Sequence, residues 1–509
     1  MSLARSPLTR LLALVAAIAA APACDGPVSR GAAPTGAETS PPVDPSISFV
    51  PSCGGGEPCV ALELAAPPAF SAPAPLEPTT PAVAPRTAES RREPPLPSAG
   101  PGAVTSACHA GWRSGPSPAD LPLPDDVRSF DHLGLNVALD GRFLAAGADG
   151  DDARGVDAGV VWVYERDDDG AFRPSEPLVA SDAFAQDHFG WQLDLDGGVL
   201  AVAAPRHAHG GGFETGAVYV FELVDGAWTE VAELVGPVTR EAGFGDSVRV
   251  RGDQILVGAQ RDGVRGEDVG AAFLYERGPD GVWALVTRLD PRAAHPGARV
   301  GAGLALARDL AVVGGDGEDG GAAWIFRRHA GVWREVARLS PPDRSADALF
   351  GGAVDVDGRT LLVGGQGQAV DGVAEVGAVW AWVLEGDTWS PRGRVTPPIA
   401  VAGAHFGASI RLDGDLAAIG AWGDDADGAP AGATWIAARQ KGVWSAGARL
   451  ADPRGAAGDR LGLSVAFRDG LLAAGVWGAD TVGPDAGKVL VFAAASCADD
   501  GAAVADATE

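Results

Sequence analysis

From about residue 130 to residue 497 the chain repeats one pattern of hydrophobic and polar positions. In the unit that begins at Phe189, apolar residues alternate with polar ones in four short runs, each ended by Gly, Asp or Pro ("FGWQLDLDGGVLAVAAP", "GAVYVFELVDGAW", "TEVAELVGP"). A period of two is typical of β-strands that are buried on one face, and the unit has no helical period. Each unit is therefore predicted to be four antiparallel strands joined by tight turns.

Every unit opens on an apolar residue followed by glycine. These anchors are Leu133-Gly134, Phe189-Gly190, Phe244-Gly245, Val300-Gly301, Phe350-Gly351, Phe406-Gly407 and Leu461-Gly462. Their near-constant spacing of about 55 residues indicates a repeat protein. A four-stranded sheet repeated around a closed ring is a β-propeller blade. The predicted fold is thus all-β, a seven-bladed propeller of four-stranded antiparallel blades.

The last unit lacks a fourth strand. Six units place an aromatic residue at the start of that strand, and these residues are Phe172, Trp228, Trp283, Trp333, Trp389 and Trp444. Trp112, upstream of the first unit, aligns as the seventh, so residues 108–129 are predicted to supply the outer strand of the last blade and to cover its open edge. The predicted blades are 130–185, 186–240, 241–296, 297–346, 347–402, 403–457 and 458–497.

The apolar-Gly openings, with "GAVYVF" in the third strand, resemble the FG-GAP repeat of the integrin α-subunit N-terminal propeller and of its bacterial relatives. The resemblance covers about residues 108 to 497. Kelch repeats also combine paired glycines with a later Trp ("LLVGGQG", "DTW"), but they lack the Phe-Gly opening. The resemblance implies a binding, scaffold or adhesion module at the cell surface.

One tripeptide invites a different interpretation. Arg251-Gly252-Asp253 matches the adhesion signal that animal cell receptors bind. In the repeat it occupies the turn between first and second strands, where Gly and Asp suit a two-residue hairpin. We interpret it as a turn. Integrin-type units carry an Asp-x-Asp-x-Asp-Gly calcium loop here, which this sequence lacks, so those calcium sites are not carried over.

The N-terminal residues 1–23 are predicted to be a secretory signal. Arg5 and Arg10 precede an apolar run over 11–21 that is too short to span a membrane. Cleavage before Cys24 would give a lipid-modified bacterial lipoprotein, and the alternative is an ordinary signal peptidase site at the same bond. The expected location is therefore outside the cytoplasm, with the lipid holding the chain to a membrane on the periplasmic or outer side.

Residues 24–107 are rich in Pro and Ala and are predicted to be a disordered tether, as is the tail over 498–509. In an oxidising compartment Cys53 and Cys59 could form a small local disulfide. Cys108 and Cys497 flank the one third-to-fourth strand connection that the chain does not make, so we expect a disulfide between them. The alternative is two unpaired thiols.

The composition excludes one class of partner. The net charge of −28 leaves no basic face for nucleic acid, which binds through counterion release on a basic surface.

Catalytic motifs are missing from the sequence: we find no Gly-x-Ser-x-Gly, His-Glu-x-x-His or Cys-x-x-Cys. His132, His188 and His405 each precede an anchor, which we interpret as repeat geometry. No catalytic residue and no cofactor is predicted.

The loops between second and third strands vary most, and loops on a rigid scaffold commonly carry binding residues. The candidate binding residues on this loop face are Asp149, Asp151, Asp152, Arg206, His207, Arg261, Asp262, Asp424 and Asp425. Asp425 and Asp427, and also Asp149 and Asp151, are candidate calcium ligands, with solvated turn residues as the alternative.

Two function classes remain. The first is a binding or scaffold propeller with a protein or glycan ligand on its loop face. The second is an extracellular propeller enzyme acting on glycans, which would require carboxylates from different blades to converge in one cavity.

Overall fold

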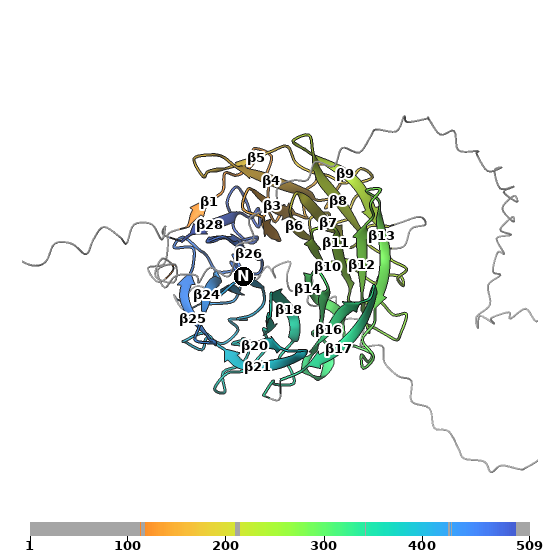
Figure 1. Ribbon diagram of the computed structural model, residues 1–509. Coiled ribbons are helices and arrows are strands. Elements are labelled where there is room, and N and C mark those ends of the chain that lie inside the picture. The colour runs from red at the N-terminus through yellow and green to blue at the C-terminus, as the bar shows by residue number, and fades with distance from the viewer. Residues whose placement is uncertain are drawn as a thin grey trace, which may run out of the picture. The chain divides into compact units, whose positions relative to one another are not determined.

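The computed structural model describes residues 112, 118–208, 214–341, 343–425, 428 and 430–494. All lie in the compact unit formed by residues 94–509. They fold into seven four-stranded antiparallel sheets around a common axis (Figure 1). The predicted seven-bladed propeller is confirmed. In the described part of the chain no helix is long and apolar enough to cross a bilayer.

The strands of each blade are numbered in chain order. Blade 1 contains β2 (Val137–Leu139), β3 (Phe143–Ala148), β4 (Val160–Arg166) and β5 (Phe172–Pro174). Blade 2 contains β6 (Gln192–Asp196), β7 (Val199–Ala204), β8 (Ala217–Val224) and β9 (Ala227–Leu234). Blade 3 contains β10 (Phe244–Arg251), β11 (Gln254–Ala259), β12 (Ala271–Arg277) and β13 (Trp283–Leu289). Blade 4 contains β14 (Val300–Ala307), β15 (Leu310–Gly315), the 3-10 turn η1 (Glu318–Gly320), β16 (Ala322–His329) and β17 (Val332–Leu339).

The remaining blades follow the same order. Blade 5 contains β18 (Phe350–Asp357), β19 (Thr360–Gly365), β20 (Ala378–Glu385) and β21 (Thr388–Val395). Blade 6 contains β22 (Ile410–Asp413), β23 (Leu416–Ala421), β24 (Ala433–Gln440) and β25 (Val443–Leu450). Blade 7 contains β26 (Val465–Arg468), β27 (Leu471–Gly475) and β28 (Val489–Ala493), and its outer strand is β1 (Ala119–Asp120).

The burial of each strand follows its place in the blade. The second strands, such as β7, are buried along their whole length because neighbouring blades cover both faces. The outer strands alternate, as β9 does, since one face meets solvent. Short runs of Ala, Val and Gly are therefore required in the second strands, where large side chains would push the blades apart.

The apolar-Gly anchor of one blade contacts the glycine that precedes the third strand of the blade before it. Phe406, the anchor of blade 6, forms a parallel bridge with Gly377, which precedes β20 of blade 5. A Cβ on Gly377 would lie 2.1 Å from the carbonyl oxygen of Phe406, and Gly377 has φ +86°, so only glycine fits there. The same bridge joins Leu133 to Gly487 and links blade 1 to blade 7.

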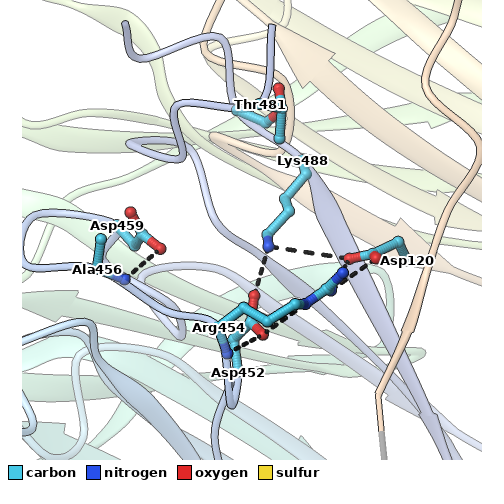
Figure 2. A network of polar contacts seen from close by, with 8 residues as sticks. Asp120, Asp452, Arg454, Ala456, Asp459, Thr481 and Lys488 are labelled. Atoms are coloured by element: carbon cyan, nitrogen blue, oxygen red, sulfur yellow. Dashed lines mark hydrogen bonds and ion pairs between the residues drawn. The ribbon is translucent and has the colours of Figure 1, made fainter. Parts of the chain in front are cut away.

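The two ends of the ring meet in blade 7, where β1 pairs with β28 (Figure 1, orange beside blue). A polar network holds β1 in place (Figure 2). Arg454 Nη2 donates to both carboxylate oxygens of Asp120, at 2.7 and 2.6 Å. Lys488 Nζ donates to the buried Asp452 and lies 3.8 Å from Asp120. Trp112 is buried against Phe467, with ring centroids 5.8 Å apart.

The structure places Arg251-Gly252-Asp253 at the predicted turn. Arg251 pairs with Gln254 across the β10–β11 hairpin, which leaves Gly252 and Asp253 as the two turn residues. Gly252 has φ +56°, which glycine adopts without strain. The Gly252 N–H also donates to Asp196 of the preceding blade, at 2.9 Å. Backbone geometry therefore accounts for the tripeptide.

Candidate functional site

Two positions of each unit lie side by side on the loop face. One is the residue just before the anchor, and the other lies one or two residues after the second strand. Across blades 7, 1 and 2 these positions form a continuous series of contacts, which we call the arc; its members are Arg460, Trp477, His132, Asp149, His188 and Arg206.

The arc is connected by stacking at one end and hydrogen bonds at the other. The Arg460 guanidinium lies 4.4 Å from the Trp477 ring centroid, and Trp477 packs edge-to-face on His132 at 5.2 Å. His132 Nδ1 and His188 Nδ1 bond the two carboxylate oxygens of Asp149, at 3.1 and 3.0 Å. The series bridges the last and first blades, where the ring closes.

Arg206 completes the arc at its second end. Its Nη1 lies 3.3 Å from His188 Nε2, and the Arg206 side chain is exposed. Trp191 packs edge-to-face on His188 at 6.4 Å and is 38% exposed. The arc therefore presents the Arg206 guanidinium to solvent beside the exposed Trp191, whereas Arg460 and Trp477 are half-buried.

Asp149 is the buried centre of the arc. Burial acts to raise the pKa of its carboxyl group, but the two imidazoles outweigh burial and hold the pKa below its usual value. For His132, burial acts to lower the pKa, and the Asp149 hydrogen bond and charge outweigh it, so the pKa lies above its usual value. A protonated His132 adds positive charge beside the two arginines.

The loop face of blades 3 and 4 shows the same arrangement of exposed arginine over buried acid. Arg261 Nη2 lies 3.7 Å from Asp246, and Arg299 Nη1 lies 3.5 Å from Asp316. The arginine side chains are 47% and 43% exposed, whereas those of the aspartates are 5% and 12% exposed. Burial raises the pKa of Asp246 to about 6 and also raises that of Asp316. A strongly acidic protein thus exposes cations on this face.

Several predicted loop residues lie beneath the face. Asp262 is fully buried and holds Arg288 of β13 at 2.6 Å. Asp424 likewise holds Arg449 of β25 at 2.8 Å. These carboxylates tie the loop to the outer strand of its own blade.

The predicted calcium ligands of blade 1 have other partners. Asp149 bonds two histidines, and Asp151 accepts the Ala153 N–H at 2.7 Å. Asp152 accepts the Asp157 N–H at 2.9 Å in the same turn. In the described residues, one group of three His, Cys, Asp or Glu ligand atoms lies within 4.8 Å, and it is Asp182, His207 and Glu233.

Other predicted sites lie outside the described residues. They are Cys24, Cys53, Cys59, Cys108, Cys497 and Asp427. The lipid, the disulfides and that calcium ligand stay predictions. Asp425 is described and exposed.

Acidic side chains from different blades also line the axis, at the end opposite the loop face. A cavity there is bordered by Asp194, Asp196, Asp355, Asp357 and Asp413, together with Arg249, Arg251, Arg411 and Arg468. An enzyme acting on glycans would require carboxylates to converge in this way. Whether these acids could act in catalysis depends on the contacts that they already make.

The axial acids complete the hydrogen bonding of the innermost strands. Each such strand has one edge with no neighbouring strand, and its N–H groups need acceptors. Asp194 of blade 2 accepts the Val250 N–H of blade 3 at 2.8 Å, and Asp355 of blade 5 accepts the Leu412 N–H of blade 6 at 2.7 Å. These carboxylates serve as blade-to-blade connections.

The axial arginines balance this charge. Arg411 Nη2 lies 3.6 Å from Asp194. Burial, with repulsion from Arg411, lowers the pKa of Arg249 to about 10, and burial raises the pKa of Asp355. Backbone N–H and guanidinium groups already engage these acids. We therefore interpret the axial carboxylates as structural connections of the ring rather than as groups that transfer protons.

The sequence interpretation missed part of the arc. Trp477 and Arg460 of the arc, and the neighbouring Trp191, were not predicted, and the histidines were interpreted as repeat geometry. The sequence did contain a signal for these residues, namely their position in the repeat. Asp149, Trp422 and Trp477 occupy the same aligned position, just after the run of small residues in the second strand. His405 stacks flat on Trp422 at 4.1 Å, which is the same contact in blade 6.

A family model of the FG-GAP repeat matches residues 175–221, 228–275, 333–381 and 389–436. Each match begins within or just after a fourth strand and ends within the third strand of the next blade. The chain is a seven-bladed propeller that contains FG-GAP repeats. No curated protein matches the sequence of this FG-GAP propeller. It is similar to a protein from Lactobacillus plantarum of known crystal structure, with 14% identity and a TM-score of 0.43, over 64% of this chain and 86% of that one.

Proposed function

We propose that this FG-GAP propeller is a binding module and that its ligand is an acidic glycan held over the arc. The observation that carries the proposal is the sequence of contacts from Arg460 through Trp477, His132, Asp149 and His188 to Arg206. It combines the exposed Arg206, the half-buried Arg460 and Trp477 and the neighbouring exposed Trp191 on a rigid scaffold, and a buried carboxylate fixes its centre.

The chemistry of the arc favours a sugar that carries carboxylate or sulfate groups. Guanidinium groups bind such anions through paired, charge-assisted hydrogen bonds. The flat faces of Trp191 and Trp477 suit the apolar C–H face of a sugar ring. An acidic peptide would use the cations but would not need the aromatic platform.

Export and membrane anchoring belong to the same proposal. Lipid on Cys24 would hold the propeller at a membrane outside the cytoplasm, and residues 24–107 would act as a spacer. Glycans of a cell surface would then lie within reach of the loop face. A mass spectrum showing an unmodified N-terminus on exported protein would reject the lipid.

A panel of matched oligosaccharides tests the ligand class. The full chain should bind acidic oligosaccharides more tightly than the same oligosaccharides after reduction of their carboxyl groups, as measured by calorimetry. Equal affinity for both forms would overturn the role of the arginines. Binding of an acidic peptide and of no glycan would replace the glycan by a protein ligand.

Catalysis is tested separately. If the axial aspartates were an active site, then acidic oligosaccharides would be cleaved on prolonged incubation, and Asp355→Asn would abolish cleavage. We expect bound oligosaccharides to be recovered intact.

A further inference from the structure

A second cluster of polar side chains lies in blade 2, next to the Arg206 end of the arc. His207 follows β7, Asp182 lies in the connection from β5 to β6, and Glu233 is on β9. His207 Nε2 lies 3.6 Å from Asp182 Oδ2 and 3.9 Å from Glu233 Oε1. The His207 side chain is 7% exposed, whereas that of Asp182 is 50% exposed, so the cluster opens to solvent on one side.

Two further residues orient the cluster. Asp187, which is buried, lies 3.1 Å from His207 Nδ1. An ionised carboxylate only accepts hydrogen bonds, so the contact with Asp187 is made by the Nδ1–H, and Nε2 faces Asp182 and Glu233. When Nε2 loses its proton, its lone pair points toward these two carboxylates. The Tyr219 hydroxyl donates to Asp182 Oδ1 at 2.7 Å, and this leaves Oδ2 directed at His207.

The other blades provide an internal comparison. The residue paired with Tyr219 across the β8–β9 ladder is Glu233. The corresponding residues opposite the third strands of blades 3, 4, 5 and 6 are Arg288, Arg338, Arg394 and Arg449.

Blade 5 shows what the arginine does. Trp380 Nε1 donates to Asp343, as Tyr219 does to Asp182, and Arg394 pairs with Asp343 at 3.2 Å. In blade 2 the arginine position holds the acid Glu233, which lies with Asp182 beside His207. Three carboxylates surround one imidazole, and such a group attracts a cation.

We propose that Asp182, His207 and Glu233 bind a divalent transition metal ion, with Zn²⁺ as the expected occupant. The donor set is one imidazole nitrogen and two carboxylates, which suits Zn²⁺, and the open side admits water as a fourth ligand. Asp187 on Nδ1 is the carboxylate that commonly orients a metal-bound histidine. This site is independent of the glycan proposal.

The spacing fits an ion of this size. Ligand atoms about 2.0 Å from a tetrahedral zinc lie about 3.3 Å from one another. The distances from His207 Nε2 to the two carboxylates exceed that value by only a few tenths of an ångström, which side-chain rotation can absorb.

Zinc titration of the full chain tests the site. The protein is prepared without a His tag, stripped with a chelator, and titrated with Zn²⁺ against a chromophoric zinc chelator. Glu233→Arg installs the arginine of blade 5, so it should fold and pair with Asp182 while losing the site. We expect wild type to bind one more zinc per chain than Glu233→Arg. We expect Asp187→Asn to bind that zinc about 10- to 100-fold more weakly.

The controls separate this site from other zinc ligands. His295→Gln removes an exposed histidine that lies 3.7 Å from Asp319, and it should bind zinc as wild type does. Cysteine thiolates elsewhere would contribute equally to all variants. Equal zinc stoichiometry and affinity in wild type and in a folded Glu233→Arg variant would overturn the proposal, as would a loss in His295→Gln equal to that in Asp187→Asn.

Discussion

Replacing Lys488 by Met should weaken the junction where the ring closes. The Lys488 ammonium donates to Asp452, whose side chain is 1% exposed, and the Lys488 side chain is 12% exposed. Removing one partner of a buried ion pair costs about 3 to 5 kcal/mol because the other charge stays buried. Asp452 keeps hydrogen bonds from the Arg454 backbone N–H at 2.9 Å and from its Nε at 3.4 Å, so we expect the lower end, about 3 kcal/mol.

Thermal unfolding followed by circular dichroism measures this loss. For a propeller of this size, about 3 kcal/mol corresponds to a melting temperature lower by about 4 °C. Because Lys488 also lies beside Asp120 of β1, limited proteolysis should cut the N-terminal segment sooner in the variant. Lys441→Met is the matched control, since Lys441 is the other lysine of the chain and is exposed at a hairpin tip. A Lys488→Met variant that melts with wild type, or no lower than Lys441→Met, would refute the reasoning.

Three other predictions follow from the fold. Burial acts to raise the pKa of Asp452, but the hydrogen bonds from Lys488 and Arg454 outweigh it, so the pKa in the folded protein is lowered. Asp452 therefore contributes stability at pH values above its unfolded pKa of about 3.8. That stability is lost as the pH falls through the lower folded pKa. The melting difference between wild type and Lys488→Met should therefore shrink between pH 7 and pH 3, and a constant difference would contradict this. Phe350→Ala should cost about 3 to 5 kcal/mol in denaturant unfolding and Phe350→Leu much less, because Phe350 is fully buried and leucine serves as anchor elsewhere. Arg251→Ala should leave any cell adhesion unchanged, and loss of adhesion in a folded variant would show that the tripeptide is recognised.

The fold could be predicted because repetition multiplies a weak signal. One alternating stretch such as that after Phe189 does not define a propeller, whereas seven copies with the same order of turns do. The glycines were equally informative, since Gly377 and its counterparts are required by close backbone approach between blades. The predicted place of Trp112 rested on counting the aromatic residues of the outer strands.

The candidate binding face was harder to predict because its contacts join residues of different blades. Asp149 was predicted as a candidate site residue because it is an acid in a loop. Its partners His132 and His188 are 17 and 39 residues away along the chain. Asp262 and Asp424 look alike in sequence to exposed loop acids, yet arginines of the outer strands bury them. Glu233 is distinguished from its neighbours only when β9 is compared with the outer strands of other blades.

The most direct test of the central claim is the affinity of an acidic oligosaccharide for Arg460→Gln, measured by calorimetry beside wild type and Arg154→Gln. Arg154 is exposed in a loop of blade 1 outside the arc. Loss of a charge-assisted hydrogen bond costs about 1.5 to 3 kcal/mol, so Arg460→Gln should bind about 10- to 100-fold more weakly, and Arg154→Gln should bind as wild type does. Undiminished binding by Arg460→Gln, or an equal loss in both variants, would contradict the assignment of the ligand to the arc.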